Sequence, residues 1–349
     1  MCWLADWINN KRVFIMKNKK GFEIQFNWIF VLVAGALILL FFITIVVKQR
    51  NLSETSTKST IFASVGAIIA GAGVSTGTTT IIDLPGSNIE VDCGRVSIGE
   101  IAKQYQNLIL FAPKSIQGKK LITQTVEFNT PYKSTNLLFM TSTQMRYILI
   151  GDSDLAIEIN NSLPSDLNKE FYKNIPVTIS DENNYKVKFV FFRNIDNSIL
   201  NKFAKMQDDD VTAVRVTGDI KKGELEFYKK NSLIWKSNGI SPYFTKSALL
   251  GAIYSDSNDL YQCNMANVFS RLNIISNVYL KRTTALKNDV TRIRNECKSI
   301  YTNALNHLQS INSASSVLNE PNVEVIASAS QSLSDENKKA QLASCPLIY

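Results

Sequence analysis

A long apolar segment near the N-terminus constrains this chain more than any other feature. The segment Ile24–Val47 contains no charged residue, and lysine or arginine lies within a few residues of both of its ends. The hydrocarbon core of a bilayer is about 30 Å thick, so about 20 residues of helix are needed to cross it. The segment therefore predicts one transmembrane helix. No second apolar run in the sequence is long enough to span a membrane.

The charges that flank this segment indicate its orientation. Five basic residues precede it and three follow it closely: Lys11, Arg12, Lys17, Lys19 and Lys20, then Lys48, Arg50 and Lys58. Cytoplasmic flanks carry the excess of positive charge, which predicts a cytoplasmic N-terminus over residues 1–23. The apolar core is longer than that of a cleaved signal peptide, so we expect an uncleaved signal-anchor over residues 24–47. The predicted location is the plasma membrane, with the lipid bilayer as first partner and the C-terminal part extracellular. Translation starting at Met1 or at Met16 is compatible with this topology.

A second interpretation comes from the residues that begin the segment. The sequence Lys19-Lys20-Gly21-Phe22, followed by a long apolar run, resembles the signal of type IV pilin-like proteins. That resemblance implies cleavage after Gly21 and assembly through the apolar helix. In that family a glutamate stands five residues after the cut, whereas this chain has Phe26 there and Glu23 lies too early.

Composition indicates a substantial globular region beyond the membrane. Of the 349 residues, 45% are hydrophobic and 19% are charged, which is sufficient to bury a core. The formal net charge is +8, but lysine and arginine are scattered and form no arginine-rich tract. We therefore expect a basic surface near anionic lipid or cell-wall polymer, and no nucleic-acid partner.

The cysteines suggest an oxidising compartment. Cys93, Cys263, Cys297 and Cys345 follow the membrane segment, and an even number outside favours two disulfides over buried free thiols. Three connectivities are possible. Cys297 and Cys345 are each 24 residues from Pro321 in the sequence. If two helices meet antiparallel near Pro321, these two cysteines therefore lie side by side. Cys93 would then pair with Cys263. The pair Cys263–Cys297 requires a hairpin near Arg282.

The region beyond the membrane segment divides by sequence pattern into three parts. Residues 48–80 predict a juxtamembrane connector, residues 81–256 a mixed α/β region, and residues 257–349 a helical region. We expect short helices at Asp166–Asn174 and Asn197–Met206, a β-α-β unit over Tyr185–Asp219 and a central strand at KFVFF. The segments that read as strands are IIDL, NIEVDC, LILFA, LITQTVEF, NLLFMTS, MRYILIG, KVKFVFFR, VTAVRV, ELEFYKK, SLIWK and LLGAIYS.

The C-terminal region carries the strongest helical periodicity outside the membrane. Apolar residues recur every three or four positions through residues 257–312, and their phase shifts near Arg282–Leu286. Two helices in a hairpin, or one helix with a stutter, would explain the shift. A last helix is expected after Pro321. These stripes are typical of packed core, and the alternative is a surface for envelope proteins or surface polymers. The predicted fold is thus an α/β (or α+β) ectodomain with a mixed sheet and a C-terminal helical hairpin, on a single N-terminal transmembrane helix.

Few motifs point to chemistry. His307 is the only histidine, so histidine-rich metal sites and histidine-dependent hydrolases are excluded. AGVSTGTT resembles a phosphate loop, but Thr78 replaces the essential lysine. Two carboxylate pairs are candidates for Ca²⁺ or Mg²⁺, or for a carboxylate-dependent extracellular enzyme. They are Asp152 with Asp154, and Asp208 with Asp210.

The chain as a whole resembles uncharacterised single-pass envelope proteins of archaea. The opening KKGFEIQFNWIFVLVAGALILLFF and the ending SCPLIY carry this resemblance. It implies an outward-facing, membrane-anchored domain with paired cysteines and no particular activity. We therefore expect a structural or binding component of the envelope, with no cofactor and no catalytic activity. The oligomeric state is left open.

Overall fold

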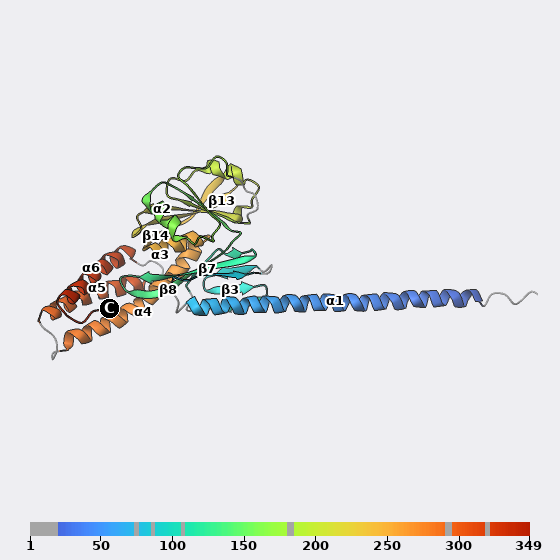
Figure 1. The fold of residues 1–349 in the computed structure, drawn as a ribbon, viewed down its shortest axis with the longest axis horizontal. Coiled ribbons are helices and arrows are strands. Elements are labelled where there is room, and N and C mark those ends of the chain that lie inside the picture. Colours follow the sequence, from blue (N-terminus) through green and yellow to red (C-terminus); the bar gives the residue numbers. More distant parts are fainter. Residues whose placement is uncertain are drawn as a thin grey trace, which may run out of the picture. The chain divides into compact units, whose positions relative to one another are not determined.

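The computed structural model describes residues 20–72, 77–84, 88–105, 109–179, 185–289, 295–317 and 322–349 (Figure 1). The fold is α+β, with mixed sheets, C-terminal helices and one N-terminal apolar helix, as the sequence predicts. The chain divides into two compact units, Met1–Thr57 and Lys58–Tyr349.

Helix α1 (Lys20–Ala72) contains the predicted membrane segment. Its part Trp28–Arg50 has a mean hydropathy of 3.2, and none of the window that defines it is buried within the structure. Among the described residues, it is the one helix long and apolar enough to cross a membrane. Apolar residues surround the whole helix here, which is the pattern expected for contact with lipid.

Residues 48–72 continue α1, where the sequence suggested a separate connector over residues 48–80. In the second unit, Ile61, Val65 and Ile69 are buried against the small sheet described below. Their spacing of four residues places them on one helix face, so burial of that face stabilises the helix. Residues 73–76 of the predicted connector lie outside the described residues, and strand β1 already begins at Thr79.

The described residues of the second unit form three sheets. A four-stranded sheet has the order β1 (Thr79–Asp83), β7 (Lys120–Asn129), β8 (Lys133–Ser142) and β5 (Leu110–Phe111). The small sheet has the order β4 (Ile101–Gln104), β3 (Arg95–Ile98), β2 (Ile89–Asp92) and β6 (Ser115–Ile116). A six-stranded sheet has the order β10 (Lys169–Tyr172), β9 (Arg146–Ile150), β11 (Val187–Phe191), β12 (Val211–Gly218), β13 (Lys222–Asn231) and β14 (Ile234–Phe244).

The six-stranded sheet contains the two parallel strands of the predicted β-α-β unit, but 3₁₀ helices take the place of its α-helix. Strands β10, β9, β11 and β12 are parallel, and β13 and β14 continue the sheet antiparallel. All five residues of β11 are buried, as expected for a central strand of a parallel sheet. The predicted helix at Asn197–Met206 is a 3₁₀ helix, η1 (Asn197–Phe203), and a second one, η2 (Asp208–Asp210), precedes β12.

Two further predicted elements differ from the structure. The helix expected at Asp166–Asn174 is replaced by strand β10, and the helix, α2 (Asp154–Ser162), comes earlier. The Ser153 side chain caps α2, and Pro164 follows its end, where proline disfavours a helical residue before it. The strand expected at LLGAIYS is helix α3 (Lys246–Tyr254). Thr245 caps α3, and burial of eight of its nine residues explains the continuous apolar run that suggested a strand.

The C-terminal helices form the predicted hairpin. Helices α4 (Asn258–Asn288) and α5 (Asn295–Ser316) pack together, and reciprocal hydrogen bonds join Asn273 to Asn312. The turn falls after Asn288, so the phase shift at Arg282–Leu286 lies within α4. Residues 290–294 are outside the described residues. Helix α6 (Val323–Leu342) then packs on α5.

The core joins sheets and helices in one compact unit. Strands β7 and β8 contribute alternate side chains to two clusters, Leu138 toward the small sheet and Phe139 toward α3 and α4. The predicted boundary between residues 81–256 and 257–349 coincides with the beginning of α4. Aromatic contacts join the two sides of this boundary. The ring centres of Phe111 and Tyr261 are 5.9 Å apart, and the ring of Phe244 stacks on that of Phe269.

Candidate functional site

A cleft of about 1420 Å³ lies between the small sheet, the beginning of α4 and one edge of the six-stranded sheet. That edge is where the parallel strands β11 and β12 begin. Charged residues of both signs line the cleft, with few apolar ones. The charged lining residues are Glu90, Asp92, Arg95, Lys114, Lys186, Lys205, Asp209, Asp210, Lys229, Asp256 and Asp259.

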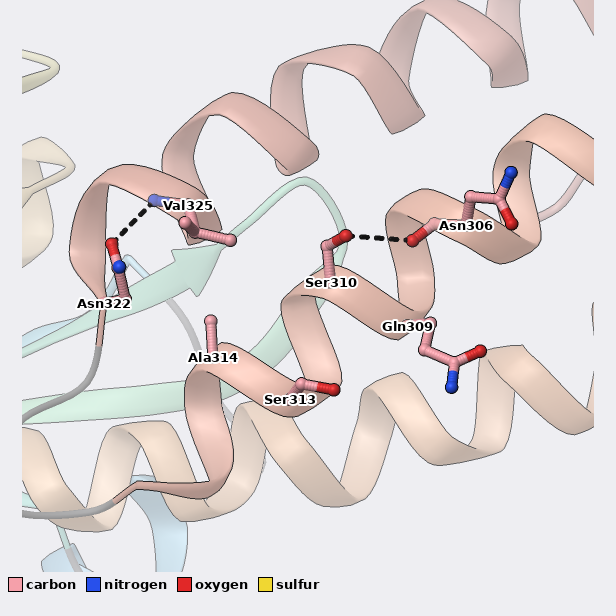
Figure 2. A pocket seen from close by; sticks show the side chains of 7 residues that line it. All are labelled: Asn306, Gln309, Ser310, Ser313, Ala314, Asn322 and Val325. Carbon is pink, nitrogen blue, oxygen red and sulfur yellow. Dashed lines mark hydrogen bonds between the residues drawn. The ribbon is translucent and has the colours of Figure 1, made fainter.

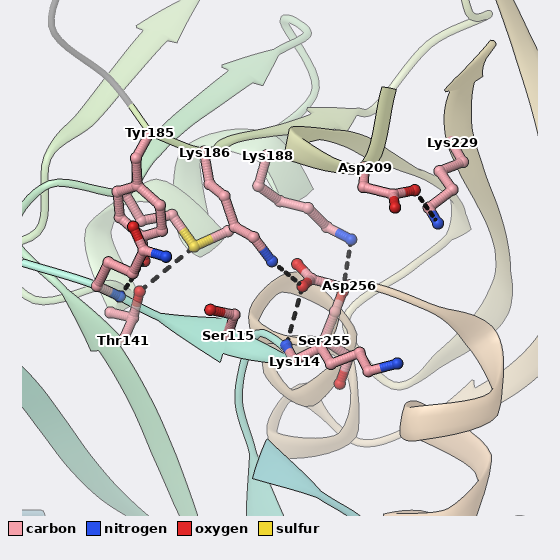
Figure 3. A network of polar contacts seen from close by, with 12 residues as sticks. Lys114, Ser115, Thr141, Tyr185, Lys186, Lys188, Asp209, Lys229, Ser255 and Asp256 are labelled. Carbon is pink, nitrogen blue, oxygen red and sulfur yellow. Dashed lines mark hydrogen bonds and ion pairs between the residues drawn. The ribbon is translucent and has the colours of Figure 1, made fainter. Parts of the chain in front are cut away.

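Asp256 is the centre of the polar network in this cleft (Figure 3). Its Oδ2 accepts a hydrogen bond from Lys186 Nζ at 2.7 Å and another from the Lys114 amide at 2.9 Å. The Lys186 and Asp256 side chains are only 10% and 11% exposed. Asp256 lies between α3 and α4, and Lys186 lies just before β11. Asp256 therefore links the segment before β11 and the segment before β6 to the α3–α4 junction, and all three residues line the cleft.

Lys188 lies two residues after Lys186, within β11, and is fully buried. Its Nζ donates to the Ser255 carbonyl at 2.5 Å and lies 5.4 Å from the centre of the Phe227 ring. Burial lowers the pKa of Lys188 to about 8. Ser255 is the C-cap of α3, so the ammonium interacts with the negative end of that helix. The amine points away from solvent, and its contact with the Ser255 carbonyl caps the end of α3, which is a structural role.

The candidate carboxylates at residues 208–210 contact lysines. Asp208 accepts from Lys230 Nζ at 2.7 Å, and Asp209 pairs with Lys229 at 2.5 Å. These lysines hold the pKa of both carboxyls below the usual range. Burial instead raises the pKa of Asp210, which lines the cleft.

Asp152 and Asp154 lie at the other end of the parallel strands, after β9. Strand β9 leads through α2 to β10, whereas its neighbour β11 leads the opposite way to β12. The carboxyl end of β9 is therefore a switch point, where ligands of open α/β sheets commonly bind. The structure does not bring Asp152 near Asp210. Within the described residues, no group of three or more His, Cys, Asp or Glu is placed to hold a metal ion.

A second hollow, of about 520 Å³, lies between α5 and α6 (Figure 2). Its lining is neutral: Asn306, Gln309, Ser310, Ser313, Ala314, Asn322 and Val325. Asn322 accepts from the Val325 amide at 3.1 Å as the N-cap of α6, and Ser310 donates to the Asn306 carbonyl at 3.1 Å. These bonds serve the helices themselves. The hollow lies on the helices that the sequence suggested as a partner surface.

The structure pairs the cysteines as the sequence predicts. Cys297 and Cys345 form one disulfide, with Cα atoms 5.8 Å apart. Cys93 and Cys263 form the other, with Cα atoms 6.0 Å apart. The first pair joins α5 to the segment after α6. The second joins the β2–β3 turn to α4 and lines the cleft.

Sequence patterns did not single out Lys186, Lys188 or Asp256. One signal was available for the two lysines. They alternate with apolar residues at the beginning of KVKFVFF, and a lysine in a strand expected to be buried needs a polar partner. Asp256, the partner of Lys186, lies 70 residues from it in the sequence, and no local pattern marks it. The chain matches no known protein family, no curated protein and no solved structure.

Proposed function

We propose that this chain is a single-pass plasma-membrane protein that displays residues 58–349 outside the cell as a structural or binding component of the envelope. The observation that carries the proposal is the apolar surface of α1. From Trp28 to Val47 its large apolar side chains are exposed on all sides, Trp28 to 74% and Leu39 to 61%. Such a surface is unfavourable in water and favourable in lipid.

Two features support the outward orientation. The basic residues before the apolar segment outnumber those after it, which favours a cytoplasmic N-terminus. The two disulfides favour an oxidising compartment for the second unit.

The cleft supports a binding role. Small-molecule pockets are mostly apolar and about 300 to 1000 Å³. This cleft is larger, and its lining carries charges of both signs. It therefore suits a charged polymer or a partner protein better than a small apolar ligand. Of the two candidate carboxylate pairs, Asp152 with Asp154 lies at the opposite end of the parallel strands from the cleft, and Asp208 in the other pair contacts Lys230. We do not extend the proposal to catalysis.

Protease treatment of intact cells tests the orientation. With different epitope tags at the two ends of the chain, protease should remove the C-terminal tag and leave the N-terminal tag protected. A C-terminal tag that becomes sensitive only after lysis would show the opposite topology. Peptide mass mapping in the same experiment distinguishes an anchor, which retains Met1 or Met16, from pilin-like processing, which leaves Phe22 first.

Introducing charged residues into the apolar part of α1 tests whether this helix anchors the protein in the membrane. Leu39→Asp with Leu40→Asp should release the protein from the membrane fraction or prevent its accumulation, because each carboxylate costs about 2.5 to 3.5 kcal/mol at the centre of a bilayer. The matched control is Ile274→Asp with Val278→Asp, since these side chains on α4 are about half exposed, at 50% and 55%. We expect the control to stay in the membrane. Equal retention of both variants would contradict anchoring by α1.

A further inference from the structure

We propose that the Cys93–Cys263 disulfide is a redox-sensitive clamp on the cleft, whereas Cys297–Cys345 is a purely structural bond. The clamp would hold the turn between β2 and β3 against α4. Its reduction by a dithiol would release that turn and open the cleft, while the rest of the fold stays intact.

The two disulfides differ in access. Cys297 and Cys345 are 4% and 6% exposed and belong to the main core. Cys93 and Cys263 are partly exposed, and both line the cleft. Thiol–disulfide exchange requires an incoming thiolate to reach a sulfur atom along the S–S axis. The cleft provides this approach to the Cys93–Cys263 bond, and core packing denies it to the other.

The β2–β3 turn depends on this bond for its attachment to α4. The hydrogen bonds of the turn run to its own sheet: Gln104 Nε2 donates to the Cys93 carbonyl at 3.3 Å, and the Tyr105 amide donates to the Gly94 carbonyl at 2.7 Å. Within the described part of the chain, no hydrogen bond or ion pair joins Ile89–Ile98 to α4. The disulfide is therefore the specific link across this side of the cleft.

Other contacts would keep the small sheet in place after reduction. The Leu110 amide donates to Asn264 Oδ1 at 3.2 Å, and the Lys114 amide donates to Asp256. Val91 and Val96 remain packed with Val65 of α1 in the second core cluster. The Lys114 contact lies just before β6 of the small sheet, and the Leu110 contact lies in β5 of the four-stranded sheet. The valines belong to the core cluster that both sheets share. The expected change is thus confined to the β2–β3 turn and the beginning of α4.

The redox step is ordinary disulfide exchange. A thiolate of the dithiol attacks one sulfur of the pair, the S–S bond breaks, and a mixed disulfide forms. The second thiol of the reductant then displaces the remaining cysteine. Cys93 and Cys263 gain two electrons and two protons and become thiols, and the reductant leaves as its own disulfide.

Differential alkylation of the full-length protein in detergent tests the proposal. The protein is exposed to increasing dithiothreitol, quenched with iodoacetamide and mapped by mass spectrometry. Cys93 and Cys263 should be alkylated at least tenfold faster than Cys297 and Cys345. Under conditions that reduce only the first pair, amide hydrogen exchange should increase in residues 88–98 and 256–264 and stay unchanged in α5 and α6.

Three results would overturn the clamp: equal reduction rates, earlier reduction of Cys297–Cys345, or selective reduction without increased exchange at the turn. The double variant Cys93→Ser with Cys263→Ser should show the increased exchange without reductant. The matched double variant, Cys297→Ser with Cys345→Ser, should leave the turn protected. If either variant fails to fold, the reduction rates and exchange of the natural protein still decide the question.

Discussion

At the scale of single residues, Lys188 links burial of a charge to the pH dependence of stability. Its pKa is lowered by burial to about 8 in the folded protein, against an ordinary value of 10.5. The unfolded chain therefore binds the proton more tightly between these values, and stability should rise with pH across this window. At lower pH both states are protonated, and the full cost of burying the charge is present.

Between pH 8 and pH 9.5, we expect the free energy of unfolding of the natural protein to rise by roughly 2 kcal/mol relative to that of Lys188→Met. Lys188→Met keeps the volume and removes this titrating group, whereas the tyrosines whose pKa is raised by burial, such as Tyr254 and Tyr261, lower the stability of both proteins alike as pH rises. Urea unfolding in detergent at several pH values measures both. Parallel curves for the two proteins would contradict the assignment of this pH dependence to Lys188.

The ion pair between Lys186 and Asp256 provides a second residue-scale prediction. Asp256→Asn removes the charge that neutralises a lysine only 10% exposed, and should cost about 2 to 3 kcal/mol. Glu158→Gln is the control, because Lys246 and Glu158 are 40% and 48% exposed and lie 3.1 Å apart. That change should cost less than about 1 kcal/mol. Thermal unfolding compares them, and similar losses would mean that Asp256 makes no special contribution.

At the scale of elements, the periodicity of apolar residues was sufficient to predict a helix or strand where the tertiary packing agreed with that pattern. The apolar strand in KFVFF and the amphipathic C-terminal helices were predictable, because burial on both faces or on one face leaves a distinct pattern. Helix α3 was not, since it is buried all round and its apolar run reads equally well as a strand. The cleft was beyond prediction for a related reason: Lys186 and Asp256 meet only because β11 and the α3–α4 junction come together.

The second half of α1 shows how packing turned a predicted connector into a helix. Val65 is 1% exposed in the core cluster of the small sheet, whereas Ala67 on the same helix is exposed. Val65→Asp should destabilise the second unit by about 3 to 5 kcal/mol, because it buries an unpaired carboxylate. Ala67→Asp should change stability by less than about 0.5 kcal/mol. Thermal unfolding of both variants tests this. Equal stability would show that the helix face does not contribute to the core.

At the scale of the whole molecule, the sheets and the C-terminal helices depend on one another. The main core contains residues from β7 and β8, from the six-stranded sheet and from α4, α5 and α6. The C-terminal segment closes this core: Tyr349 packs on Tyr132 with ring centres 5.6 Å apart, and the Ile348 amide donates to Asn337 Oδ1 at 2.8 Å. Neither the sheets nor the helices have a complete core alone.

Two truncations test this interdependence. A chain ending at Asp256 loses the helices that cover Phe111 and Phe244, so we expect it to lack near-ultraviolet circular dichroism and a cooperative thermal transition. A chain of residues 58–349 retains the whole second compact unit and both disulfides, and should unfold in one cooperative transition. Native-like folding of the first truncation would show that residues 81–256 form an independent domain, because a cooperative fold must then be possible without any contribution from α4, α5 or α6.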